Sequence, residues 1–175
     1  MKHTRTYDIA FVGLKPGIHE YNYQIDDSFF ENFEKPEFNQ TQIEVKLSFD
    51  KKQGIFLLKF AINGKIIIAC DRCGDDYEMN LWDEFELVVK QIDDELVAQK
   101  ADEDAEVAYI GRSESLLDVS PWIYEFIILS VPIQHIHPDD KEGKSTCNPQ
   151  ALAYLTTQSS NPISANWEEL KNKLN

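Results

Sequence analysis

The strongest constraint on the fold is a pair of β-like segments on either side of the pentapeptide DKKQG at residues 50–54. Ile43, Val45, Leu47 and Phe49 occupy every second position before this loop, with polar residues between them, and residues 55–62 follow it. Successive side chains of a strand point to opposite faces of a sheet. The pattern therefore predicts a β-hairpin with one buried face.

Further strands are expected around this hairpin. The predicted segments are residues 7–14, 18–25, 65–69 and 82–92. Lys15-Pro16-Gly17 predicts a turn that pairs the first two of these segments, and Asn63-Gly64 predicts a second tight turn. The first 92 residues are therefore expected to form an antiparallel sheet of about five or six strands.

The second half of the chain predicts one long helix. Ser120 and Pro121 are typical of an N-cap and a first helical residue, and Pro132 ends the pattern. The apolar face is formed by Trp122, Ile123, Phe126, Ile127 and Leu129. The predicted fold class is α+β, with an antiparallel β-sheet in the N-terminal half and a packed C-terminal helix.

Three shorter segments complete the expected organisation. Residues 26–33 open with two acids and predict a short helix before Pro36. Residues 93–106 contain seven acids and one lysine, which predicts a solvated loop. At 175 residues we expect a single domain over 1–155 and a tail over 156–175 that ends in a short helix.

The charge of the chain is strongly negative and unevenly distributed. Lysine and arginine number 17 against 31 aspartates and glutamates, for a net charge of −14. Residues 1–69 carry nine of each sign, so the whole excess lies in residues 70–175. Phosphate repels such a protein at long range, which argues against a sequence-independent grip on DNA or RNA and against anionic membranes.

Apolar runs and cysteine usage indicate a compartment. The longest apolar stretch, over residues 122–133, is interrupted by Glu125 and Ser130 and is shorter than the roughly 20 residues that span a bilayer. Three cysteines without a recognisable secretory signal favour thiols or metal ligands in a reducing environment. We expect a cytoplasmic protein.

The most specific motif is the C-x-x-C pair of Cys70 and Cys73, directly after a predicted strand. Two thiolates at this spacing can bind one zinc ion from the same side. Cys147 adds a third thiolate, so a tetrahedral site needs a fourth ligand from His135, His137, a carboxylate or water. No helix is predicted to begin at this pair, which argues against redox catalysis. The alternative to a zinc site is therefore a pair of ordinary cysteines in a structural turn.

Two other clusters have weaker chemical meaning. The run His135-Ile136-His137-Pro138-Asp139 begins a metallo-hydrolase pattern, but Asp140 stands where that pattern needs a histidine. The sequence is therefore that of a polar loop after a helix. The basic side chains of the first half are a candidate RNA contact, although charged hairpin ends are common. They are Lys2, Arg5, Lys15, Lys51, Lys52, Lys59 and Lys65.

The order of these parts resembles the YceD family, bacterial and plastid proteins associated with accumulation of large-subunit ribosomal RNA. The resemblance is strongest over residues 64–155. It is carried by Cys70, Arg72 and Cys73, by Leu117-Asp118, Glu125, the run 127–129 and Pro132, and by His135 or His137 followed by Cys147. Many relatives carry C-P-x-C-G-x-N-L in the late segment, whereas this chain has Gln150 in place of the second cysteine.

The resemblance implies a role in the synthesis, processing or stability of 23S ribosomal RNA and implies no known reaction, and we expect a factor that acts without catalysis. The implied partner is a large-subunit precursor or a basic ribosomal protein, toward which the acidic half would be steered. Cys70, Cys73 and Cys147 would hold the late segment against the sheet. Arg72 and Glu125 are the candidates for a buried or partner-facing ion pair.

Two rival functions remain at this point. One is a metal-dependent ribonuclease that uses His135, His137 and Asp139. The other is an acidic protein-binding module for a basic partner, without a direct role in ribosomal RNA.

Overall fold

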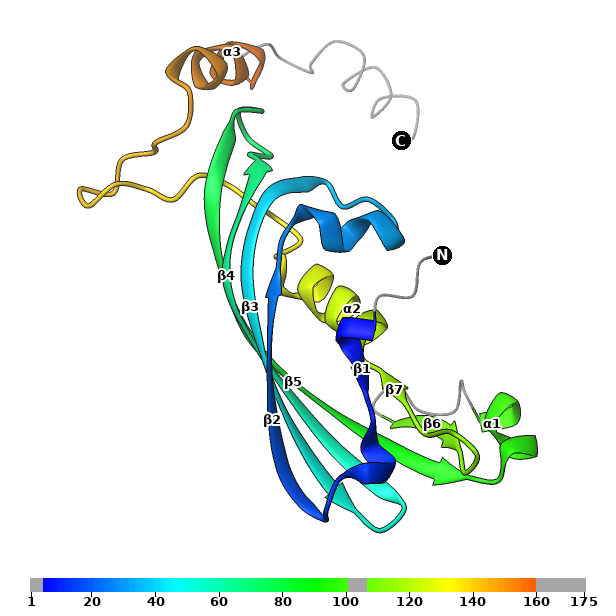
Figure 1. The fold of residues 1–175 in the computed structure, drawn as a ribbon. Helices are drawn as coiled ribbons and strands as arrows, with labels where there is room; N and C mark the ends of the chain where they lie inside the picture. The colour runs from blue at the N-terminus through cyan, green and yellow to red at the C-terminus, as the bar shows by residue number, and fades with distance from the viewer. Residues whose placement is uncertain (1–4, 101–106, 160–175) are drawn as a thin grey trace, which may run out of the picture. The chain divides into compact units, whose positions relative to one another are not determined.

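The computed structural model describes residues 5–100 and 107–159, which form an α+β fold (Figure 1). The chain divides into two compact units. The first comprises the residues up to Ile68 together with Glu78–Ile133, and the second comprises Ala69–Tyr77 together with the chain from Gln134 onward. The single domain expected over residues 1–155 stays a prediction.

Most elements are joined by short connections, but residues 131–148 form a long one. In chain order they are the 3₁₀-helix η1 (Arg5–Tyr7), β1 (Asp8–Ile9), the 3₁₀-helix η2 (Phe11–Gly13), β2 (Gly17–Ile25), the 3₁₀-helix η3 (Asp27–Asn32), β3 (Phe38–Lys52), β4 (Ile55–Ala69), β5 (Asp76–Ile92), α1 (Asp94–Lys100), β6 (Val107–Gly111), β7 (Leu117–Asp118), α2 (Ser120–Ser130) and α3 (Pro149–Ser159).

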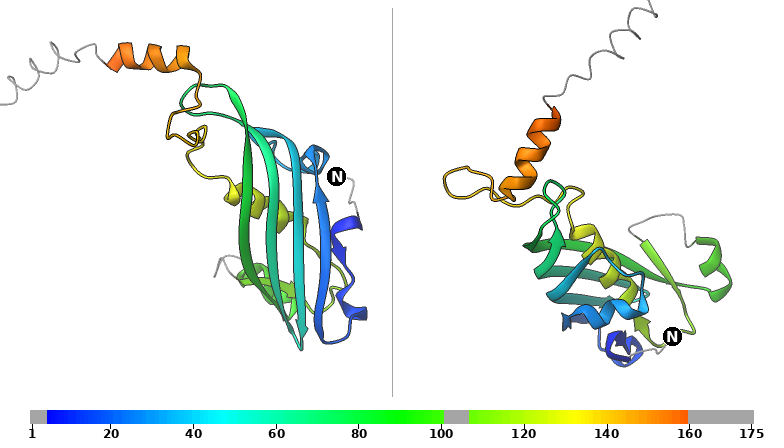
Figure 2. Two further views of the ribbon diagram at one scale, coloured as in Figure 1. Left: turned by 90° about the vertical axis from the view of Figure 1, so that its left-hand side faces the viewer. Right: turned by 90° about the horizontal axis from the view of Figure 1, so that it is seen from above.

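Five strands form one sheet in the order β2-β3-β4-β5-β6, seen face-on in Figure 2. The pairs β2–β3 and β3–β4 are antiparallel, whereas β6 runs parallel to β5, with Val107 opposite Val88. The predicted α+β class is confirmed, but the sheet is mixed rather than wholly antiparallel. The connection that contains α1 lets the chain return in the same direction, which a tight turn could not do.

The predicted hairpin is confirmed as β3 and β4. Phe49 lies opposite Leu58 and Val45 opposite Ile62, and all four side chains are buried. The strands continue well beyond the predicted ends, because the apolar side chains of β4 recur every second residue as far as Ile62 and resume at Ile66 and Ile68. This pairing supplies one face of the core.

The turn predicted at Asn63-Gly64 is wrong, because β4 runs through both residues. Gly64 lies opposite Ile43, next to a register shift in β3 between Asn39 and Gln42. A Cβ atom at Gly64 would clash with the Gln42 carbonyl oxygen and lie 2.6 Å from the Ile43 Cα. Glycine here permits a close approach of two strands, which is a second common use of glycine in a sheet.

The strand pair predicted for residues 7–14 and 18–25 is also wrong. β2 forms, but its partner is β3, and residues 7–14 contain only the two-residue strand β1, which pairs with β7. The Lys51 ammonium group donates to the carbonyl oxygens of Phe11 and Leu14 at 2.6 and 2.7 Å, which fixes this segment. Within residues 5–92, four strands rather than five or six therefore belong to the main sheet.

The loop predicted over residues 93–106 is wrong where the structure describes it, because residues 94–100 form α1. Asp94 and Glu95 lie in its first turn and Lys100 in its last, the placement that the helix dipole favours. The acids that indicated solvation therefore also favour a helix start. Residues 101–106 of this prediction lie outside the described residues.

Helix α2 lies across one face of the sheet (Figures 1 and 2). Its Ile123 and Ile127 side chains are fully buried, and the Phe126 ring stacks on Phe85 with centroids 4.5 Å apart. The predicted apolar face is correct except at Leu129, which is 60% exposed. The N-cap lies one residue earlier than predicted, since Ser120 is already helical.

Helix α3 was not predicted, and it covers the first four residues of the expected tail, residues 156–159. The short helix expected in NWEELKNKLN lies outside the described residues.

The short helix predicted over 26–33 is confirmed as η3, and its first residue anchors a neighbouring strand. Asp27 accepts hydrogen bonds from the backbone N–H groups of Gln40 at 2.9 Å and Thr41 at 2.8 Å, where Gln40 adopts a φ of 51°. The Thr41 bond chiefly holds the pKa of the Asp27 carboxyl below its usual 3.8, although burial opposes this. The carboxylate thus stabilises the register shift in β3.

We expect Asp27→Asn to lower the free energy of unfolding by about 1 kcal/mol at pH 7, because an amide oxygen replaces a charged acceptor. The carboxyl pKa is lower in the folded state, so its contribution is complete above pH 4 and lost as the pH falls through the folded-state value. Urea unfolding of both proteins from pH 7 to pH 3 measures this. A difference that does not shrink toward pH 3 would contradict the role of the charge.

Candidate metal centre

Cys70 and Cys73 lie in the turn that joins β4 to β5. The Cys70 N–H donates to the Asp75 carbonyl at 3.0 Å, and the Gly74 N–H donates to the Cys70 carbonyl at 2.8 Å. Gly74 has a φ of 78°, in the left-handed region that favours glycine. These bonds fold the turn so that both thiols face the same side.

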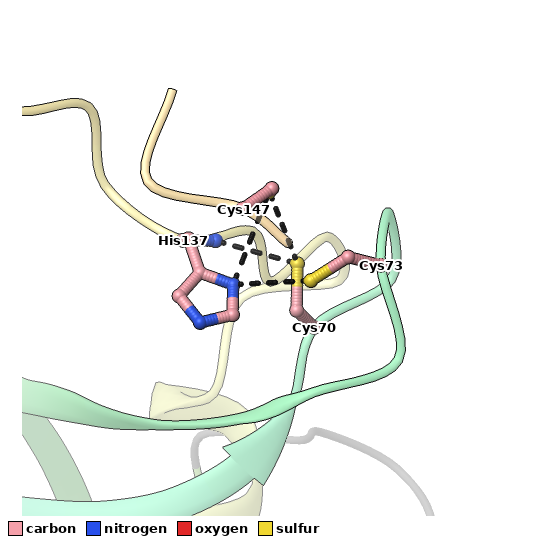
Figure 3. A group of neighbouring side chains, drawn as sticks. All are labelled: Cys70, Cys73, His137 and Cys147. Atoms are coloured by element: carbon pink, nitrogen blue, oxygen red, sulfur yellow. Dashed lines mark hydrogen bonds between the residues drawn. The ribbon is translucent and has the colours of Figure 1, made fainter. Parts of the chain in front are cut away.

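The late segment of the chain brings a histidine and a third cysteine close to this turn. The ligand atoms of Cys70, Cys73, His137 and Cys147 all lie within 4.8 Å of one another (Figure 3). The His137 Nδ1 atom lies 3.5 Å from the Cys73 sulfur and 3.9 Å from the Cys147 sulfur, and the Cys70 and Cys147 sulfurs are 3.8 Å apart. All four residues belong to the second unit.

The separations of 3.5, 3.8 and 3.9 Å are close to those of a tetrahedral metal site. Zinc–sulfur bonds of about 2.3 Å and zinc–nitrogen bonds of about 2.0 Å place sulfurs about 3.8 Å apart, and sulfur and nitrogen about 3.5 Å apart. Three thiolates and one imidazole also form one of the common donor sets of structural zinc sites. The cluster therefore has the size and the chemistry to hold one zinc ion.

The electrostatics of the cluster favour a thiolate at Cys70. Burial raises the pKa of this thiol, but hydrogen bonds from His137 and from the backbone N–H groups of Arg72 and Cys73 outweigh burial and lower the pKa to about 6. At Cys147 the hydrogen bond with the Ser145 hydroxyl lowers the pKa of the thiol. Burial and the neighbouring sulfurs outweigh this effect, so the pKa of Cys147 is raised. Adjacent thiolates repel one another, and a divalent cation would relieve that repulsion.

The two candidate histidines have different surroundings. The His137 ring faces the three sulfurs, and its backbone N–H lies 3.5 Å from the Cys70 sulfur. The His135 ring stays outside this group, because its Nδ1 lies 2.9 Å from the Ala69 carbonyl and 3.3 Å from the Asp71 carboxylate. A carbonyl only accepts, so His135 carries its proton on Nδ1.

Further contacts fix the late segment around the cluster. The Tyr77 ring packs against His137 with centroids 4.6 Å apart, and the Asn148 amide donates to the Asp75 carboxylate at 3.0 Å. Gln150 lies in the first turn of α3, where its N–H donates to the Asn148 side chain. No sequence pattern singles out Tyr77, since a single aromatic residue after a C-x-x-C pair has many structural uses.

The proposed partner-facing pair lies on two different elements. Arg72 is exposed on the turn, with its guanidinium 3.4 Å from the Ser145 hydroxyl, and Glu125 is exposed on α2. Their pairing stays a prediction.

The candidate RNA contact is largely engaged within the protein. Lys51 is bound to carbonyl groups, Lys59 contacts Glu84 at 2.7 Å, Lys65 contacts Glu78 at 2.8 Å and Lys52 contacts Asp50 at 3.3 Å. Phosphate would have to compete with these partners. Lys2 and the side chain of Arg5 lie outside the described residues.

The fold and the cluster together define an α+β protein with a C-x-x-C turn closed by a later histidine and cysteine. Residues 58–172 match the family described as large ribosomal RNA subunit accumulation protein YceD, and the chain belongs to this family. No curated protein and no solved structure matches the chain. Among the described residues, no helix combines the length and the apolar character needed to cross a membrane.

The two histidines provide a direct test of the donor set. We expect the purified protein to bind one Co²⁺ with sulfur-to-cobalt charge-transfer absorption. His137→Ala should weaken this binding more than about tenfold, because loss of a direct ligand should cost more than loss of a residue that only supports a ligand, which commonly costs at least that much. His135→Ala is the matched control and should keep the absorption spectrum. A larger loss in His135→Ala than in His137→Ala would contradict the assignment of the imidazole ligand.

Proposed function

We propose that this protein is a non-catalytic factor that supports the accumulation of 23S ribosomal RNA during large-subunit assembly in the cytoplasm. Membership of the YceD family supports the link to the large ribosomal subunit. The closed donor set carries the non-catalytic part of the proposal. Structural zinc sites are held by four protein ligands, whereas catalytic sites keep one position for water or substrate.

In this proposal zinc has a mechanical role. Bound to Cys70, Cys73, His137 and Cys147, it would tie the β4–β5 turn to the late segment of the same unit. The ribonuclease alternative would need His135 and His137 to act on one metal ion. The His135 ring instead contacts the Ala69 carbonyl and the Asp71 carboxylate, which hold it outside the group of ligand atoms.

The acidic protein-binding module is the second candidate function. The net charge of −14, concentrated after residue 69, favours it independently of any link to RNA. Such a module would bind a basic partner with an affinity that falls steeply as salt is added. It differs from the first proposal in leaving ribosomal RNA unchanged when the protein is lost.

We expect depletion of the protein to lower the ratio of 23S to 16S ribosomal RNA, and wild-type protein to restore it. Cys73→Ala should fail to restore the ratio, because a site with only three protein ligands binds zinc more weakly and no longer holds the late segment firmly on the turn. Trp82→Ser is the matched control, since this side chain is 73% exposed on β5. An unchanged 23S to 16S ratio on depletion would overturn the proposed function and leave the acidic module.

A further inference from the structure

Helix α2 is apolar on both of its sides, although residues 5–100 and 107–159 cover only one of them. Ile123, Phe126 and Ile127 are buried, while Leu129 on the opposite side is 60% exposed. Glu125 is the single charged residue among the eleven of the helix. A helix that is apolar all round is normally covered all round, but the part of the chain that the structure describes places no element over the outer side of α2.

The outer side forms a groove of about 420 Å³ within the first unit. Its floor is a stripe of α2 made by Pro121, Tyr124, Glu125, Ile128 and Leu129, and Phe33 forms its wall. The Phe33 and Tyr124 rings stack with centroids 4.6 Å apart and 8° between their planes. The Tyr124 hydroxyl donates to the Glu34 carbonyl at 3.2 Å, so the wall is fixed before any ligand binds.

The spacing of the stripe indicates the shape of the ligand. Positions 121, 124, 125, 128 and 129 follow the i, i+3, i+4, i+7, i+8 pattern over about two helical turns, a length of roughly 12 Å. Such a stripe is the surface by which one helix packs on another. The groove therefore fits a helix that offers apolar side chains at matching intervals.

The rim of the groove indicates the charge of the ligand. Glu125 lies within the stripe, and the adjoining segment 31–37 carries three exposed glutamates against one lysine. Within the described ranges 5–100 and 107–159, none of these four glutamates forms an ion pair. Lysine or arginine from a partner would find free carboxylates beside the apolar stripe.

We propose that this groove binds a basic amphipathic helix of a partner protein, with an aliphatic side chain seated between Phe33 and Leu129 and a lysine or arginine paired with Glu125. The inference rests on the proposed function for the source of that helix, because proteins that neutralise RNA phosphate are rich in these residues. The groove itself is independent of the metal centre.

Three labelled peptides with the same helical design test this inference by fluorescence anisotropy. The first carries leucines along one face and lysines beside them, the second replaces the leucines by serine, and the third replaces the lysines by glutamate. We expect the first peptide to bind at least about tenfold more tightly than the other two, because it alone satisfies both the stripe and the rim.

Variants of the protein assign the binding to the groove. Leu129→Ser and Glu125→Lys should each weaken binding of the first peptide about tenfold, and Glu125→Lys should gain affinity for the glutamate peptide. Glu86→Lys is the matched control, because its side chain is 79% exposed on β5 and the charge change is the same. Equal losses of affinity in Glu125→Lys and Glu86→Lys would show that the negative charge of the whole protein attracts the peptide without a specific site, and would overturn the inference.

Three further outcomes test this inference against a second copy of the chain and against the proposed function. If Leu129→Ser converts a dimer of the protein to a monomer in sedimentation experiments, the groove binds a second copy and the inference is wrong. Groove binding with an unchanged 23S to 16S ratio on depletion would support the groove and overturn the ribosomal role. A fall in that ratio without groove binding would support the ribosomal role and overturn the inference about the groove.

Discussion

The pairing of β3 with β4 is the interaction on which the remaining structure depends. Thirteen residue pairs hold the two strands in register, and the side chains on their common face are almost completely buried. A slip of one residue would turn this face toward solvent. The same pairing provides the surface on which α2 packs and ends at Ile68, whereas β4 itself extends to Ala69, immediately before the first cysteine of the candidate metal centre.

The sequence predicted those parts of the fold whose pattern is local. The alternation over 42–49 identified β3, and the apolar positions of 122–127 identified the buried side of α2. It failed where a choice depended on distant residues. Nothing near Gly64 indicates that a strand will pass close to its backbone, and nothing near residues 7–14 indicates that Lys51 will bind their carbonyl groups.

The candidate metal centre also has a local part, which could be predicted from the sequence, and a part that depends on distant residues, which could not. The C-x-x-C spacing predicted that Cys70 and Cys73 share one turn, because that geometry is local. The choice of His137 over His135 depends on which ring the late segment turns toward the sulfurs, and this is set by the contacts of His135 with Ala69 and Asp71. Gln150 leaves the chain without a fourth cysteine, and the His137 imidazole occupies the corresponding place in the donor set.

We propose that His137 serves as a metal ligand and takes part in no reaction. The ratio of 23S to 16S ribosomal RNA in cells that carry only His137→Cys tests this role most directly, because a thiolate can replace the imidazole as a zinc ligand and yields a four-cysteine site. We expect a ratio near that of wild type, with His137→Ala well below it. An equally low ratio in both variants, with zinc still bound to His137→Cys, would show that the imidazole itself is required and would contradict a role as a ligand alone.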